Sequence, residues 1–168
     1  MTDIVCWLEQ LKADLRLLHT PSQGANQADN QAKGQSRLVY AVSHTPAAIF
    51  GPIHTEQHSE ALAYWFEACQ QLHRLYHLQG DSDMAYSYQQ FAYSKLQALA
   101  SDPEQDTAMK RWCLKKLDRM VVSMMEFCQQ QSSPQWEQEG AALVELHVLY
   151  MQGQQHMNMA YAHSQTYR

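Results

Sequence analysis

Histidine is the residue type that most invites a chemical reading of this chain, which carries nine of them. His73 and His77 are four positions apart, so on a helix both imidazoles lie on one face, as zinc- or iron-binding pairs do. A carboxylate such as Glu145, two residues before His147, would complete a metal site between facing helices. This pattern predicts, as one alternative, a metal-dependent enzyme built in a helical bundle.

Other sequence signals of catalysis are absent. Neither E-x-x-H nor H-E-x-x-H occurs, and there is no G-x-S-x-G motif or glycine-rich phosphate loop in a chain with only six glycines. Cys113 and Cys128 fall on the apolar stripe of one predicted helix, where thiols are buried and unreactive. The sequence therefore favours a non-enzymatic protein that needs no cofactor.

Most of the chain reads as amphipathic helices. Apolar residues recur at three- and four-residue steps over residues 3–19, and a helical pattern holds from residue 56 to the C-terminal end. Gly80, Asp102-Pro103, Ser133-Pro134 and Gly153 separate the later helices, which we predict at residues 56–79, 82–100, 103–131, 134–152 and 154–168. Short connections make each helix antiparallel to the next. We predict an all-α fold of antiparallel helical hairpins.

Two segments near the N-terminus depart from this pattern. Residues 20–36 contain no large apolar residue, and their Gly, Asn, Gln and Ser content predicts a flexible linker between an N-terminal helix (1–19) and a helical domain (37–168). Residues 37–53 combine the β-prone Leu-Val-Tyr-Ala-Val with turn signals at His44-Thr45-Pro46 and Gly51-Pro52. A short β-hairpin and an irregular packed arm both fit that segment.

An internal repeat lies in the predicted helices. The sequence LHRLY at 72–76 corresponds to LHVLY at 146–150, and Met84-Ala85-Tyr86 corresponds to Met159-Ala160-Tyr161, at an offset near twice a 34-residue helical hairpin. The aromatic residue, turn glycine and two small residues typical of the tetratricopeptide repeat are matched by Tyr76, Gly80, Ala85 and Ala92. Part of the chain thus resembles a tetratricopeptide-like helical array, with one good unit and one degenerate one. An ordinary antiparallel helical bundle is the alternative.

The tetratricopeptide resemblance implies a protein–protein interaction module. Such a module would act as an adaptor or chaperone-like scaffold that binds a peptide or a helix of its partner. The groove-lining face of the first repeat helix would carry Glu67, Gln70, Arg74 and His77, which are polar residues at helical spacing. A plain solvated face is the other interpretation of these four residues.

A basic stripe is the second candidate surface. Arg111, Lys115 and Arg119 lie along one edge of a predicted helix, in a chain whose net charge is −5. Such a stripe could bind an acidic partner or a nucleic-acid backbone. Asp118 interrupts it and no aromatic residues interleave it for base stacking, so nucleic acid is not an expected partner.

Cysteine usage and the N-terminal residues predict a cytoplasmic protein. The four cysteines are widely spaced, form no C-x-x-C pair and sit in apolar helical stretches: Cys6, Cys69, Cys113 and Cys128. The first residues lack the basic region of a secretion signal, and no run of about 20 apolar residues could cross a membrane. A structural subunit that forms a homodimer through residues 3–19 or the tyrosine-rich helix at 82–100 is a further alternative.

Overall fold

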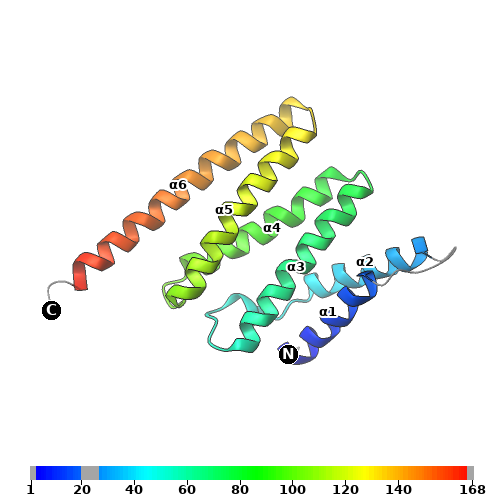
Figure 1. Ribbon diagram of the computed structural model, residues 1–168, viewed down its shortest axis with the longest axis horizontal. Helices are drawn as coiled ribbons and strands as arrows, with labels where there is room; N and C mark the ends of the chain where they lie inside the picture. Colours follow the sequence, from blue (N-terminus) through cyan, green and yellow to red (C-terminus); the bar gives the residue numbers. More distant parts are fainter. Residues whose placement is uncertain (1–2, 20–26, 166–168) are drawn as a thin grey trace. The chain divides into compact units, whose positions relative to one another are not determined.

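Six α-helices and one short 3-10 helix make up the described part of the chain in the computed structural model (Figure 1). The structure describes residues 3–19 and 27–165, and side chains for 3–19 and 29–156. The helices are α1 (Ile4–His19), α2 (Gln27–Ser43), η1 (Ala47–Phe50), α3 (Glu56–Leu78), α4 (Ser82–Ser101), α5 (Thr107–Gln130) and α6 (Pro134–Gln165). The predicted all-α fold is confirmed. Within the described residues no helix has the length and apolarity needed to cross a membrane.

The chain divides into two compact units, Met1–Leu114 and Lys115–Arg168. The boundary falls inside α5, whereas the sequence predicted a single helical domain from residue 37 to residue 168. The N-terminal helix α1 belongs to the first unit together with α2, α3 and α4. It is therefore part of a compact body and not a tethered appendage.

Residues 27–43 form α2, where the sequence predicted the end of a linker and the start of a hairpin or an irregular arm, and these predictions were wrong for those residues. Residues 44–46 and 51–53 lie outside the helices on either side of η1, so this part of the segment is an irregular stretch and not a β-hairpin. The first half of α2 is polar, but its second half buries Leu38, Ala41 and Val42 where α2 packs on α1 and α3. Tertiary burial of an apolar face stabilises helices whose own propensity is weak. Residues 20–26, the remainder of the predicted linker, lie outside the described part of the chain.

The first unit has one apolar core. α1 contacts α2 and α3, α2 also contacts α3, and α3 pairs most extensively with α4. The largest fully buried side chains of this unit are Leu8, Leu11, Leu38, Ile49, Leu62, Trp65, Leu72, Leu96 and Leu99. The indole of Trp65 meets the ring of Phe50 in η1 edge-on at 4.9 Å and that of Phe91 in α4 at 5.6 Å. One tryptophan thus joins three elements.

The turn between α3 and α4 depends on a glycine. Gly80 has a φ of +78°, a left-handed conformation that a Cβ would disfavour. Its N–H donates to the carbonyl of His77 (3.0 Å) and the N–H of Asp81 donates to that of Tyr76 (3.0 Å), which is the Schellman pattern. Asp81 then caps α4 by accepting from the N–H of Met84 (3.1 Å). The predicted cap glycine and the predicted start of α4 are confirmed.

The small residues of the repeat motif lie where α3 and α4 pack together. Ala85 and Ala92 are fully buried, and Nδ1 of His73 is 3.0 Å from the carbonyl oxygen of Ala85. The rings of Tyr76 and Tyr88 stack across the hairpin at 5.7 Å. The second copy of the motif, Met159-Ala160-Tyr161, lies outside the described side chains. The resemblance to the tetratricopeptide repeat therefore stays a prediction.

The start of α5 differs from the predicted one. The helix starts at Thr107 and not at Pro103, and Asp106 caps it by accepting at Oδ1 from the N–H of Ala108 (2.8 Å). The side chain of Gln105, just before the helix, is buried, and its Oε1 accepts from the N–H of Ile53 (2.8 Å). The Gln105 side chain thus anchors the segment before α3, and α5 starts one turn later than predicted.

The second unit is a hairpin of the later part of α5 with α6. The ring of Phe127 meets that of Trp136 edge-on at 5.7 Å, and a Cβ added to Gly140 would lie 3.1 Å from the Cβ of Cys128. α6 continues through Gly153, so the predicted break there was wrong. A helix tolerates one interior glycine at a cost of about 1 kcal/mol.

A candidate binding pocket between α1 and α2

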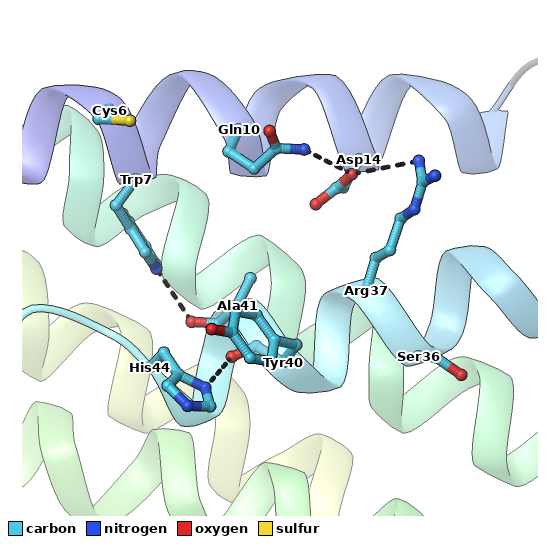
Figure 2. A pocket seen from close by; sticks show the side chains of 9 residues that line it. All are labelled: Cys6, Trp7, Gln10, Asp14, Ser36, Arg37, Tyr40, Ala41 and His44. Carbon is cyan, nitrogen blue, oxygen red and sulfur yellow. Dashed lines mark hydrogen bonds and ion pairs between the residues drawn. The ribbon is translucent and has the colours of Figure 1, made fainter. Parts of the chain in front are cut away.

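A pocket of about 690 Å³ lies between α1 and α2 (Figure 2). This volume is within the range of small-molecule and peptide side-chain sites. Its described walls are Cys6, Trp7, Gln10 and Asp14 from α1, Ser36, Arg37, Tyr40 and Ala41 from α2, and His44, the first residue after α2. Two helices packed into the core of the first unit thus supply most of these lining residues.

Trp7 joins the two walls. Its indole is 6% exposed, and its Nε1–H donates to the carbonyl oxygen of Ala41 at 2.9 Å. Breaking the hydrogen bond of a buried donor is energetically costly, because the donor is then left without an acceptor. The hydrogen bond therefore fixes α1 against α2 at this end of the pocket (Figure 2).

A buried carboxylate lies further along α1. Asp14 is 3% exposed, and its Oδ1 accepts from Nε2 of Gln10 (3.1 Å). Nη1 of Arg37 lies 3.8 Å from the same oxygen, a distance too long for a direct hydrogen bond. Because the Arg37 side chain is 57% exposed, its guanidinium retains donors that face solvent.

An aromatic pair at the end of α2 completes the described pocket lining. The rings of Tyr40 and His44 stack with centroids 3.9 Å apart and an interplanar angle of 20°. Nδ1–H of His44 donates to the carbonyl oxygen of Tyr40 (2.9 Å), which in the neutral imidazole leaves Nε2 as the acceptor nitrogen. Tyr40 is 65% exposed, which is high for a ring of this size. The pair offers a flat apolar surface with polar edges.

The pocket also carries the exposed thiol of the chain. Cys6 is exposed, whereas Cys69, Cys113 and Cys128 are buried, and none of the four forms a disulfide. Burial raises the pKa of the Cys69 thiol far above its usual value and that of Cys113 to about 12. Cys6 is consequently a natural reporter of what occupies the pocket.

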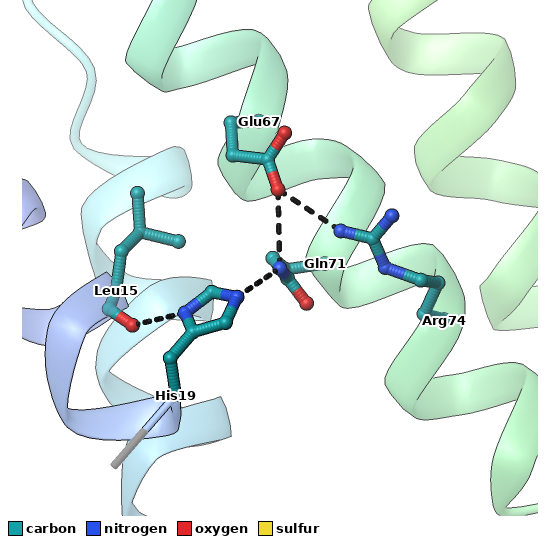
Figure 3. Close-up of polar contacts among 5 residues, drawn as sticks. All are labelled: Leu15, His19, Glu67, Gln71 and Arg74. Carbon is teal, nitrogen blue, oxygen red and sulfur yellow. Dashed lines mark hydrogen bonds and ion pairs between the residues drawn. The ribbon is translucent and has the colours of Figure 1, made fainter.

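The predicted groove on α3 is tied to α1 by a polar network (Figure 3). Glu67 accepts from Nη2 of Arg74 (2.9 Å) and from Nε2 of Gln71 (3.1 Å). The same Gln71 nitrogen lies 3.0 Å from Nε2 of His19, whose Nδ1–H donates to the carbonyl of Leu15 (2.7 Å). Glu67 and Arg74 are thus brought together, and Gln71, which donates to Glu67, is the residue that contacts the end of α1.

The other two groove residues lie on the same helix, where Gln70 is half-buried and His77 is exposed. Neither side chain is among the residues of the polar network shown in Figure 3. The prediction that these four side chains bind a partner stays a prediction. The basic stripe likewise stays one, and its members Arg111, Lys115 and Arg119 are all exposed on α5.

The predicted metal ligands do not gather into a coordinating cluster. The rings of His73 and His77 lie parallel with centroids 6.1 Å apart, and Glu145 is exposed on α6. Burial is the main reason that the pKa of His73 is lowered, while its hydrogen bond to Ala85 acts in the opposite direction. Among the described residues, no three His, Cys, Asp or Glu side chains are arranged to hold a metal ion.

Residues 19–163 match a family described as a protein of unknown function, DUF2753. No curated protein and no solved structure matches the chain. The matched range begins at the last residue of α1, so it includes the α2 wall of the pocket and excludes the α1 wall. The family assignment carries no activity to compare with this geometry.

Proposed function

Since the chain belongs to the DUF2753 family, whose function is unknown, we propose from its geometry that it is a non-enzymatic interaction module. Its partner would be a protein that presents a short peptide segment to the pocket between α1 and α2. The observation that carries this proposal is the exposed Tyr40–His44 stack in the lining of a preformed pocket. Exposed aromatic rings of this kind are enriched at interfaces.

The pocket is suited to a peptide because it combines an apolar surface with donors and acceptors. The Tyr40–His44 pair can pack against one aromatic or aliphatic side chain. The exposed donors of Arg37 can reach a peptide carbonyl or carboxylate, and the acceptor Nε2 of His44 can receive a peptide N–H. Rigid helical walls lower the ordering cost of binding.

The existing contacts of the polar side chains favour binding over catalysis. Asp14 is engaged by Gln10 and Arg37, and Nδ1 of His44 is engaged by a backbone carbonyl. Cys6 is exposed, and the hydrogen bonds that Asp14 and His44 form with Gln10 and Tyr40 do not involve it. These side chains can position a ligand, but they do not include a nucleophile that is activated by a neighbouring base.

The free thiols bear on where the protein acts. None of the four cysteines forms a disulfide, and three are buried in helices as small apolar residues. Thiols are maintained in this form in reducing compartments. We therefore place the interaction module in the cytoplasm as part of the proposal.

The test is a selection of peptides from a random displayed library on the full chain, followed by affinity measurements by fluorescence polarisation. Peptides bound in the pocket should lose at least about tenfold in affinity with Tyr40→Ala and His44→Ala, since aromatic anchors contribute about 2 kcal/mol or more. The matched control is Leu78→Ala, which removes a 77% exposed side chain outside the pocket.

Bound peptide should also slow alkylation of Cys6, which lines the same pocket. Peptides that retain full affinity for both variants and leave the alkylation rate unchanged would contradict the proposal. A selection that yields no specific peptide would contradict it as well.

A further inference from the structure

α6 is apolar on more than one side. Its buried or half-buried residues toward α5 include Leu143, His147 and Tyr150. On the remaining surface Leu146 is 65% exposed, Leu149 58% and Val148 47%. A helix that is apolar around its whole circumference is normally buried on all sides.

The exposed apolar residues form an ordered stripe, which we call the α6 stripe: Ala142, Leu146, Leu149 and Gly153. The steps of four, three and four residues match the seam of a coiled coil. The order is small, large, large, small, and it reads the same from either end. A surface with that order is complementary to itself when two copies run antiparallel.

We propose that the α6 stripe binds the same stripe of a second copy of this chain in an antiparallel pair. Leu146 then packs on Leu149 of the second copy, and Ala142 faces Gly153, whose missing side chain lets the helices approach. Apart from the neighbouring backbone of α6, no atom of the described side chains lies within 4 Å of a Cβ added to Gly153, so that space is open to a partner.

The charge of α6 fits this occupant. Glu145 is the one Asp, Glu, Lys or Arg residue between Ala141 and Gly153. In the antiparallel pair it lies beside the amide of Gln152 of the second copy and away from its own counterpart. A nearly uncharged stripe suits a second apolar helix better than a charged partner.

The size of the stripe predicts a weak dimer. Twelve residues of helix span about 18 Å. An interface of this length buries less than the roughly 1,200 Å² of stable standard complexes. We therefore expect reversible association, with a dissociation constant on the order of 10–100 μM.

Sedimentation equilibrium of the full chain between about 5 and 300 μM tests the pairing. The apparent mass should rise from the 19.4 kDa of one chain toward twice that value. Leu146→Lys with Leu149→Lys should remain at 19.4 kDa at every concentration, with an unchanged circular dichroism spectrum. Leu78→Lys, which changes a leucine of the first unit that is more exposed than either Leu146 or Leu149, should associate as the wild type does.

Cysteine cross-linking in a Cys6→Ser background tests the direction. Ala142→Cys mixed with Gly153→Cys should form an intermolecular disulfide. Ala142→Cys by itself should not, because its two copies lie about 16 Å apart along the axis.

A wild-type chain that stays at 19.4 kDa throughout, or a double-lysine variant that still associates, would overturn the proposal. Cross-linking of Ala142→Cys to itself would overturn the antiparallel arrangement. None of these measurements involves the pocket between α1 and α2, so the outcome is independent of the proposed function.

Discussion

The imidazole Nε2 of His147 in α6 lies 3.0 Å from Oδ1 of Asp118 in α5. The His147 side chain is 8% exposed and that of Asp118 57% exposed, so a buried ring reaches a carboxylate at the edge of the hairpin. From the sequence, Asp118 was expected only to interrupt the basic stripe, and His147 only to lie near the predicted metal ligand Glu145. The contact instead joins the two helices of the second unit.

The first prediction concerns this contact. Asp118→Ala removes an acceptor from a buried imidazole and should lower the free energy of unfolding by about 1–3 kcal/mol. Asp118→Asn retains an acceptor oxygen at the same position and should cost less than about 1 kcal/mol. Urea unfolding at pH 7.5 measures both. Equal losses for the two variants would show that the hydrogen bond does not stabilise the hairpin.

The second prediction concerns pH. Burial lowers the pKa of His73 below its ordinary 6.5, and the nearby His77 and Arg74 act in the same direction. Below that value the unfolded chain binds more protons at this position than the folded chain, so acidification favours unfolding. The contribution is absent above about pH 6.5 and grows as the pH falls toward the lowered pKa of the folded state.

His73→Asn keeps a donor near the carbonyl of Ala85 and removes the titrating ring. The loss of melting temperature between pH 7.5 and pH 5.5 should be smaller in this variant than in the wild type. His54→Asn, which changes an exposed histidine, is the control and should retain the full loss. An unchanged pH profile in His73→Asn would refute the assignment.

Helix ends were predictable where the signal is local. Gly80 and Asp81 act through their own backbone and side chain, so the α3–α4 turn follows from two residues. The end signal at Gly153 failed because an exposed glycine weakens a helix without terminating it. The prediction for the start of α5 failed because the Gln105 side chain accepts a hydrogen bond from Ile53, which is 52 positions away.

The pocket was not predictable because each wall depends on the other. α2 forms where its apolar half is buried against α1 and α3, and residues 27–36 contain no large apolar residue that would indicate this burial in the sequence. The signal available was the four-residue step between Tyr40 and His44, which places both rings on one face of a helix. The β-prone residues of the same segment favoured a strand instead, so this helical spacing was not used in the prediction.

The third prediction concerns thiol reactivity. Cys6 is exposed, while Cys69, Cys113 and Cys128 are each no more than 1% exposed. Native protein should take up one equivalent of N-ethylmaleimide rapidly at pH 7.5, and guanidinium-unfolded protein should take up four. Intact mass spectrometry counts the adducts. Cys6→Ser should abolish the rapid phase, and two or more rapid adducts in the native chain would contradict the described packing.

The fourth prediction concerns the end of α5. Ser132 has a φ of +50°, a left-handed conformation that costs a residue with a Cβ roughly 1 kcal/mol. Ser132→Gly relieves this strain just past the helix end and should raise the free energy of unfolding by about 0.5–1 kcal/mol. Ser123→Gly, at an exposed site inside α5, should lower it by about 0.5 kcal/mol, because glycine is the weaker helix former there. Urea unfolding of both variants and the wild type measures these two changes in the free energy of unfolding, which should have opposite signs. A loss of stability in Ser132→Gly similar to that in Ser123→Gly would mean that Ser132 is not held left-handed in solution.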